Sequence, residues 1–296
     1  MRVFVTGASG FVGSAVVAEL ITAGHHVTGL VRSDIAAKAL AAAGADVYLA
    51  SLEDLDTLKR GAATADGVIH LAFNHDFSKF AESCELDHRA IEALGAALEG
   101  TAKPLLVTAG VALVAIGRTA TEEDSGPTVS AAYPRVSEWA AEALISRGVR
   151  AAVVRLPPSV HGHGDHGFVP MLIAIAREKG VSAYVGEGLN PWSAVHRRDA
   201  AQVFRLALEH GATNARYHAV AEEGVPFREI AESIGRHLNL PIVAKSPEEA
   251  AVHFGWFAMF AGMDAHASSA WTREALGWTP SQKGLLADMQ ESSYFA

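Results

Sequence analysis

The 296-residue sequence predicts an α/β protein in which helices cover both faces of a doubly wound parallel sheet. Three observations predict this class. Short apolar segments alternate with helix-like segments through the first half of the chain. A glycine-spaced turn joins the first predicted strand to the first predicted helix. Hydrophobic residues make up 50% of the chain, which is enough for a large buried core.

The elements of the first half alternate in chain order. Strands are predicted at residues 2–6, 26–31, 46–49, 67–71, 103–108 and 151–156, each a short and mainly apolar run. Helices are predicted between them at residues 11–23, 34–43, 55–60, 80–98 and 131–147. Because a helix separates each strand from the next, the strands are expected to run parallel.

The second half has a different pattern and begins with a histidine- and glycine-rich loop at residues 160–167. Helices are predicted at residues 169–179, 199–209 and 226–238, and strands at residues 183–185, 192–196 and 216–220. The apolar segment 254–263 is expected to be core or pocket wall. We therefore expect a first domain over residues 1–158, to which residues 194–220 return, and a smaller α+β part over residues 159–296.

The turn after the first strand carries the strongest functional signal. Gly7 allows a tight turn, Gly10 lets the backbone approach a phosphate, and Gly13 lets the helix pack closely on the strand. The helix N-terminus then presents free N–H groups and a partial positive charge. This arrangement predicts a dinucleotide site of the Rossmann type. Its expected contacts also include Thr6, Ser9, Phe11 and Val12.

Charge and cysteine content narrow the function classes. The net charge is −9 without basic runs, which argues against a nucleic-acid partner. Cys84 is the only cysteine, so no disulfide can form within the chain; we expect a packing role for it and a cytoplasmic location for the protein. No stretch reaches about 18 uninterrupted apolar residues, so no membrane span is expected. These features suit an enzyme that acts on a small molecule.

Five segments, in order and spacing, match motifs of one known family. They are residues 6–13 (TGASGFVG), 67–72 (GVIHLA), 155–162 (RLPPSVHG), 194–199 (AVHRRD) and 276–280 (LGWTP). The chain thereby resembles the extended or atypical short-chain dehydrogenase/reductases, which are similar to NAD-dependent epimerases and dehydratases. The resemblance implies a homodimer through the helices predicted at residues 80–98 and 131–147. It also implies cofactor contacts from Leu71, Ala72, Phe73, Pro157, Ser159 and Val160.

The end of the second predicted strand bears on the choice of nicotinamide cofactor. An acidic residue there would bind the ribose diol of NAD and repel a 2′-phosphate. Arg32 and Ser33 stand there instead, and a guanidinium can bind a phosphate through two hydrogen bonds. NADP(H) is therefore preferred, with NAD(H) as the alternative if Arg32 is only a solvated surface residue. Ser51 and Leu52 hold the place where the family often has an aspartate near the adenine, so a backbone contact is expected there.

The catalytic pattern of the family is broken in this chain. The resemblance implies a tyrosine acid with a lysine four residues later, whose charge lowers the tyrosine pKa. If Tyr133 is that tyrosine, Ser137 holds the lysine position. If Ser137 and Glu138 match the family's Ser-Lys pair, Pro134 holds the tyrosine position. Neither alignment gives a Tyr–Lys pair.

The upstream hydroxyl of the family is altered as well, and three proton donors remain open. Thr108 carries the only hydroxyl at the end of the fifth strand, and Gly110 stands where a serine is expected. Tyr133 can donate the proton, with positive charge from Arg135 or the cofactor. A histidine can serve instead, since its ordinary pKa lies near neutral pH. In the third possibility, water or an already protonated iminium substrate supplies the proton.

The histidine candidates are His75, after the fourth strand, and three residues of the 160–167 loop, His161, His163 and His166. The expected catalytic set is Tyr133, Thr108 and His161. The expected substrate pocket contains His75, Gly110, His163, His166 and Trp192. The loop histidines and Asp165 have the right ligand types for zinc, but their spacing suits a polar loop over the active site better, and no metal is expected.

We therefore expect an NADP(H)-dependent oxidoreductase that reduces a C=O or C=N bond of a small to medium-sized substrate. The broken Tyr–Lys pair keeps an alternative open, an NADP(H)-binding regulator or redox sensor with little catalysis. A sugar-nucleotide epimerase or dehydratase is the weaker alternative, because that chemistry normally depends on the Tyr–Lys pair.

Overall fold

The computed structural model describes residues 1–130, 133–290 and 294–295. Its main feature is a seven-stranded sheet with the order β10-β6-β5-β4-β1-β2-β3, in which every neighbouring pair is parallel. The strands are β1 (Arg2–Thr6), β2 (His26–Val31), β3 (Asp46–Leu49), β4 (Gly67–His70), β5 (Leu105–Gly110), β6 (Ala151–Leu156) and β10 (Arg216–His218). The chain moves outward from β1 to β3 and then restarts on the other side with β4. Such a reversal leaves a crevice at the carboxyl ends of the strands, where ligands bind in this class of sheet.

Helices cover both faces of this large sheet, which confirms the predicted fold class. On one face lie α1 (Phe11–Thr22), α2 (Asp34–Ala42) and α7 (Arg197–Glu209). On the other lie α3 (Leu55–Thr64), α4 (Phe80–Ala96) and α5 (Ser137–Ser146). Each face buries its own apolar cluster against the sheet, so the inner strands are buried on both sides, as expected for parallel strands, whereas the edge strand β3 is largely exposed.

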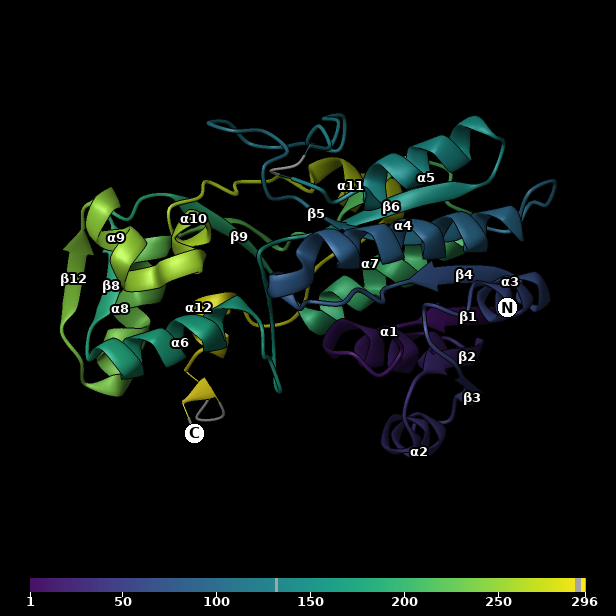
Figure 1. The fold of residues 1–296 in the computed structure, drawn as a ribbon, viewed down its shortest axis with the longest axis horizontal. Helices are drawn as coiled ribbons and strands as arrows, with labels where there is room; N and C mark the ends of the chain where they lie inside the picture. Colours follow the sequence, from purple (N-terminus) through teal and green to yellow (C-terminus); the bar gives the residue numbers. More distant parts are fainter. Residues whose placement is uncertain (131–132, 291–293, 296) are drawn as a thin grey trace.

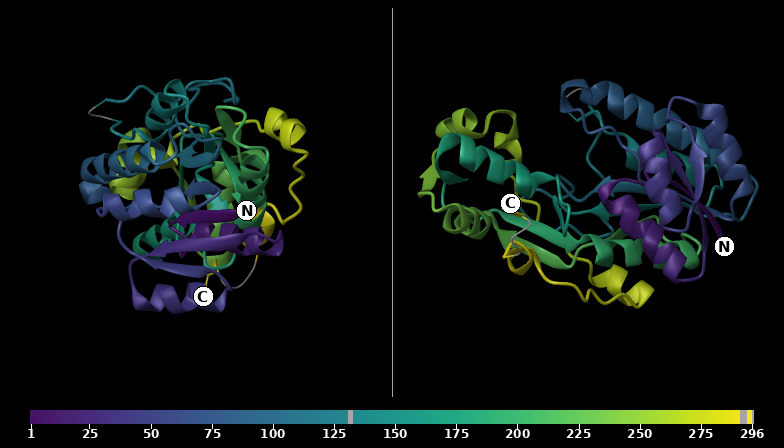
Figure 2. Two further views of the ribbon diagram at one scale, coloured as in Figure 1. Left: turned by 90° about the vertical axis from the view of Figure 1, so that its right-hand side faces the viewer. Right: turned by 90° about the horizontal axis from the view of Figure 1, so that it is seen from below.

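The remaining elements form a C-terminal part at the opposite end of the molecule from β1 (Figures 1 and 2). Its strands are β7 (Ser159–His161), β9 (Pro191–His196) and β11 (Glu222–Pro226) in one sheet, and β8 (Ser182–Val185) with β12 (Ile242–Lys245) in another. Its helices are α6 (Phe168–Lys179), α8 (Phe227–Leu238), α9 (Pro247–Phe254), α10 (Ala258–Ala261) and α12 (Leu285–Asp288); α11 (Ala270–Leu276) packs back toward α7. Two short 3₁₀ helices, η1 (Phe77–Lys79) and η2 (Gly255–Phe257), complete the set.

The sequence did not predict β7, β11 and β12, and it placed the start of α5 at residue 131. Among the described residues, α5 begins at Ser137, because Pro134 lacks an N–H and disfavours helical geometry in Tyr133 before it. Ser130 and Tyr133 instead close a turn, in which the Tyr133 N–H donates to the Ser130 carbonyl at 3.1 Å. Tyr133 therefore does not lie on a helix.

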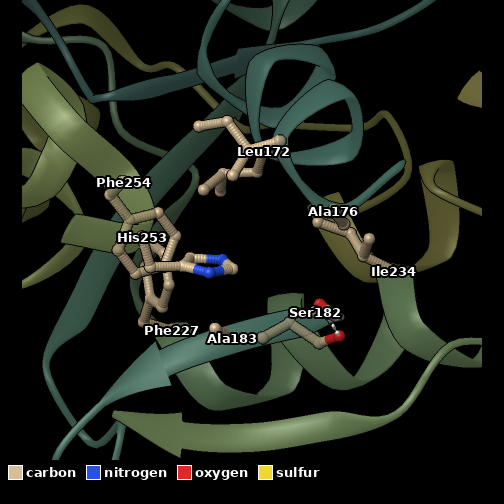
Figure 3. Close-up of a pocket in the computed structure, with 10 residues that line it drawn as sticks. Leu172, Ala176, Ser182, Ala183, Phe227, Ile234, His253 and Phe254 are labelled. Carbon is tan, nitrogen blue, oxygen red and sulfur yellow. Dashed lines mark hydrogen bonds between the residues drawn. The ribbon is translucent and has the colours of Figure 1, made fainter. Parts of the chain in front are cut away.

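A very small cavity lies within the C-terminal part (Figure 3). Its volume is about 10 Å³, room for roughly one water molecule. Apolar side chains from α6, α8 and α9 line most of it, and the His253 imidazole points into it (Figure 3). The Nε2 atom of His253 is buried without a hydrogen-bond partner among the described residues. This space is too small for a substrate.

Two further observations concern single features of the fold. Cys84 is buried in α4, and burial raises the pKa of its thiol to about 11, as expected for a packing residue. Within the described part of the chain, no helix combines the length and the apolar character needed to cross a bilayer.

Candidate active site

The glycine turn has the geometry of a phosphate cradle. Gly7 has φ +69°, and a Cβ there would lie 2.7 Å from the backbone nitrogen of Ala72. A Cβ on Gly13 would lie 1.9 Å from the Gly7 carbonyl oxygen. Gly10 caps α1 without a side-chain hydrogen bond, and the first turn of α1 contains no acidic residue. The Gly10 N–H donates to the Gly7 carbonyl at 2.9 Å, whereas the first N–H groups of α1 have no intrahelical acceptor and can bind an anion, so the residues present fit a dinucleotide pyrophosphate.

Thr6 holds this turn in position through its side-chain hydrogen bonds. Its side chain is fully buried, and its Oγ1 lies 2.7 Å from Nδ1 of His70 on β4 and 3.3 Å from the N–H of Ala72, which donates to it. The Thr6 hydroxyl is thus turned into the sheet, and the expected contact of Thr6 with the cofactor stays a prediction. Its effect is to fix the end of β4 against the glycine turn.

At the end of β2, Arg32 is exposed and Ser33 caps α2 by accepting from the Ala36 N–H at 3.3 Å. The Ser33 hydroxyl hydrogen stays able to donate to a ligand. Glu53 shares this region: a hydrogen bond from the Ser51 hydroxyl, followed by its own backbone N–H and the charge of Arg32, lowers the pKa of its carboxyl. The sequence reasoning did not include Glu53, and no motif marks it.

A chain of polar side chains runs beneath the carboxyl ends of β4 and β5. His70 Nε2 lies 3.0 Å from the Asp87 carboxylate, and the Ser137 hydroxyl donates to the other Asp87 oxygen at 2.5 Å. Arg135 in turn donates from Nε to the Ser137 hydroxyl at 3.2 Å. His70 and Asp87 are almost fully buried, so their mutual hydrogen bonds are shielded from water. No motif in the sequence marks Asp87.

Arg135 is held at the end of this chain, over the edge of the sheet. Its guanidinium donates to the Thr108 carbonyl on β5 at 3.4 Å and lies 4.3 Å above the centre of the Phe73 ring after β4. Its charge opposes the effect of burial, which raises the pKa of Tyr133. Burial, followed by the charges of Arg135 and His166, lowers the pKa of His75. The charge of Arg135 thus acts on two of the expected proton donors.

A cavity of about 340 Å³ opens beside Arg135. Tyr133, Arg135 and Gly110 line it together with residues 125–129 and the first turns of α5. The structure therefore brings the expected donor Tyr133 and the expected pocket residue Gly110 to one space. Thr108 takes another role: its hydroxyl donates to the His70 carbonyl at 2.8 Å and helps to join β5 to β4.

Glu138, at one possible lysine position, is a structural carboxylate. Its oxygens accept from Arg155 on β6, at 2.9 Å from Nε, and from Arg216 on β10, at 2.7 Å from Nε. It also accepts from the N–H of Gly126. Burial raises the pKa of Glu138, but the two arginines outweigh this effect and the net pKa is lowered. Glu138 itself carries no lysine-like charge, and Arg135 is a cation at the carboxyl end of β5.

The structure assigns His161 a different environment from the expected one. Its side chain is fully buried, and Nδ1 lies 2.9 Å from the Asp288 carboxylate. A proton donor must reach its substrate, so the expected catalytic role of His161 is replaced by a packing and hydrogen-bonding role. The neighbouring Ser159 hydroxyl is buried without a partner among the described residues, and Val160 is partly buried.

Trp192 is also a core residue and not a pocket wall. It is fully buried, its indole N–H donates to the Phe260 carbonyl at 3.2 Å, and its ring packs against Phe168 and Phe227. A long aromatic side chain on a strand gives no sequence signal that distinguishes these two environments.

The exposed loop histidines lie near the glycine turn. The His166 ring contacts the Phe11 ring at 5.7 Å, and the His163 carbonyl accepts from Arg197 at 3.1 Å. Over the residues that the structure describes, no group of three or more His, Cys, Asp or Glu residues is arranged to hold a metal.

The amino-acid sequence of the chain is similar to those of several known proteins. Residues 3–220 match the model of the "NAD dependent epimerase/dehydratase family". A Schizosaccharomyces pombe protein described as uncharacterized protein C2A9.02 is 51% identical over 100% of both chains. A 4-hydroxy-2-methyl-3-oxo-4-farnesyl-3,4-dihydroquinoline-1-oxide ketoreductase of Stigmatella aurantiaca is 30% identical over 86% of this chain and 80% of that protein.

Among solved structures, the fold is similar to that of DesIV, a dTDP-glucose 4,6-dehydratase from Streptomyces venezuelae with NAD and TYD bound. The TM-score is 0.74, with 18% identity over 98% of this chain and 96% of that one. At this identity the likeness shows the fold alone.

Proposed function

The chain belongs to the NAD dependent epimerase/dehydratase family, and from this premise we propose that it is an NADP(H)-dependent oxidoreductase that reduces a C=O or C=N bond. The substrate is small to medium-sized, in keeping with a cavity of about 340 Å³. The ketoreductase name of one relative supports this reaction type.

One observation carries the proposal. Arg135 and Tyr133 share a cavity at the carboxyl end of β5, and the glycine cradle after β1 opens at the same edge of the sheet. A proton donor with a nearby cation, at the edge where a dinucleotide binds, is the arrangement that carbonyl reduction needs. The cation compensates for the missing lysine.

Several residues are proposed to hold the cofactor. NADP(H), when bound, supplies the hydride. The backbone of Gly7, Gly10 and Gly13 holds the pyrophosphate, and Arg32 with Ser33 binds the 2′-phosphate. The expected contacts of the cofactor with Leu71, Ala72, Phe73 and Pro157 follow from their place after β4 and β6.

Tyr133 donates the proton to the substrate oxygen or nitrogen. Burial alone would hold its hydroxyl proton tightly, and the positive charge of Arg135 counteracts this and stabilises the tyrosinate left behind. Arg135 is kept in position by Ser137 and, through it, by Asp87. His75 is the second candidate donor; because its lowered pKa favours the neutral form, it must first take up a proton from solvent before it donates one to the substrate.

The test is turnover of NADPH with a panel of ketones and imines, followed by absorbance. Tyr133→Phe should lower kcat at least about a hundredfold, the usual size of general acid catalysis, and Arg135→Met should lower it comparably. Tyr184→Phe, in the C-terminal part, is the matched control and should keep the wild-type rate. An unchanged rate in Tyr133→Phe excludes it as the donor, and His75→Gln then identifies or excludes the histidine.

Tight NADPH binding without turnover of any panel member would favour a regulator or redox sensor over an enzyme. Glu138 is a carboxylate at one possible position of the family's lysine, and it is bound to two arginines. This argues against an epimerase or dehydratase that uses that lysine.

We further propose a homodimer through α4 and α5. Trp139 on α5 is 56% exposed and contacts the His88 ring of α4 at 5.8 Å, so a large aromatic group lies on the surface of this helix pair. Light scattering should give twice the chain mass for the wild type, and Trp139→Glu should give the monomer. A wild-type monomer would refute the dimer.

A further inference from the structure

Arg197, the first residue of α7, joins three elements that are distant in the sequence. Its Nη2 donates to the Ser14 hydroxyl in α1 at 2.7 Å, and its Nη1 donates to the His163 carbonyl at 3.1 Å. Its guanidinium also lies 4.6 Å from the centre of the Phe11 ring. Phe11 is the first residue of α1, directly after the glycine turn, so Arg197 lies beside the phosphate cradle.

Glycine makes room for this arginine in the covering loop. Gly162 has φ +136°, and a Cβ there would lie 3.1 Å from Cγ of Arg197. The loop is fixed from its other side, where Tyr294 accepts from the Gly162 N–H at 3.0 Å and donates to Asp165 at 3.1 Å. The carbonyl of His163 that receives Arg197 therefore belongs to a segment anchored at both sides.

The charges around Arg197 are the unusual feature. The guanidinium lies at the positive end of α7 and against the first turn of α1, which contains no acidic residue. Arg198 follows it directly, and Asp199 is engaged with the backbone N–H groups of Ser281 and Gln282. No carboxylate of the described residues pairs with Arg197, and burial followed by the charge of Arg198 lowers its pKa. Without a paired carboxylate, Arg197 favours the binding of an anion beside it.

We propose that Arg197 is a pyrophosphate-binding residue, and that it closes the 162–167 loop over the dinucleotide. This inference rests on the proposed dinucleotide site. The pyrophosphate supplies the negative charge that the N-terminus of α1 and Arg197 jointly lack. The same side chain then ties cofactor binding to the loop, through the His163 carbonyl. Arg197 thus binds the pyrophosphate, which NADPH and NADH share, whereas Arg32 is proposed to bind the 2′-phosphate, which only NADPH carries.

The test is the dissociation constant of NADPH and of NADH, measured by fluorescence titration on the full-length protein. Arg197→Ala should weaken both cofactors by the same factor, roughly ten- to hundredfold, the value of one charge-assisted contact. Arg198→Ala is the matched control, because it removes the adjacent exposed charge, and should change neither constant more than about twofold. Arg197→Met keeps the packing on Phe11 and should weaken binding as much as Arg197→Ala does.

Four outcomes are informative. An equal loss for both cofactors in Arg197→Met, with a normal melting temperature without cofactor, supports the proposal. Wild-type affinity in Arg197→Met overturns it while leaving the proposed function intact. Equal losses in the Arg197 and Arg198 variants also overturn it, since they would reflect general surface charge. A wild-type protein that binds neither cofactor refutes the proposed function itself, and this inference with it.

Discussion

The carboxylate of Glu138 should be a large contributor to stability. The Glu138 side chain is 11% exposed and pairs with Arg155, which is 0% exposed, and with Arg216, which is 15% exposed. Glu138→Gln keeps the shape and leaves the buried Arg155 guanidinium without a counter-charge, whereas Arg216 keeps its ion pair with Glu142. Removing one partner of a buried pair costs about 3–5 kcal/mol, because the remaining charge stays desolvated.

This cost can be separated from that of an ordinary surface pair. Glu142, one turn further along α5, also binds Arg216, but it is 41% exposed. Glu142→Gln should therefore cost at most about 1 kcal/mol. For a chain of this length, the loss in Glu138→Gln corresponds to a fall in Tm of about 5–8 °C. Glu138→Lys, which restores the family's lysine, should destabilise the fold further by placing a third cation in the cluster.

The assay is thermal and urea unfolding at neutral pH, followed by circular dichroism, with Glu142→Gln as the matched control. If Glu138→Gln unfolds within about 1 kcal/mol of the wild type, the buried pairing does not contribute as argued. If it keeps full stability but loses turnover, Glu138 acts in catalysis and the structural assignment is wrong.

Three further predictions concern the cofactor and pH. Gly13→Ala should raise the Kd of NADPH at least about tenfold, because its Cβ would lie 1.9 Å from the Gly7 carbonyl oxygen. The control Thr22→Ala, at the other end of α1, should leave this Kd unchanged. Equal NADPH affinities of the two variants would contradict the proposed cradle. Arg32→Ala should raise the Kd of NADPH far more than that of NADH, and equal effects would mean that Arg32 does not bind the 2′-phosphate. Burial, followed by Lys245 and Lys179, lowers the pKa of His253 from 6.5, so the unfolded chain takes up a proton that the folded chain does not, and stability should fall as pH drops below about 6.5. His253→Gln should reduce this fall in Tm, whereas a pH profile identical to that of the exposed control His26→Gln would refute it.

The sequence was sufficient for features that depend on neighbours in the chain. β1, the glycine turn and α1 lie where predicted, because strand, turn and helix signals are all local there. The short strands β7, β11 and β12 were not predicted, because each is stabilised by pairing with a strand that lies far from it in the sequence. The helix expected at residues 131–147 begins only at Ser137, because Pro134 disfavours helical geometry in the residue before it.

The site divides in the same way. The sequence by itself determined the dinucleotide cradle, because only glycine tolerates the backbone of Gly7 and the contact between Gly13 and the turn. It also showed that the Tyr–Lys pair is missing. Only the tertiary structure decided which charge stands at the strand ends: it paired Glu138 with arginines from two other strands and brought Arg135 beside Tyr133. Charge pairing acts through space, and the partners of Glu138 are separated from it by up to 78 residues of sequence, so no local pattern specifies them.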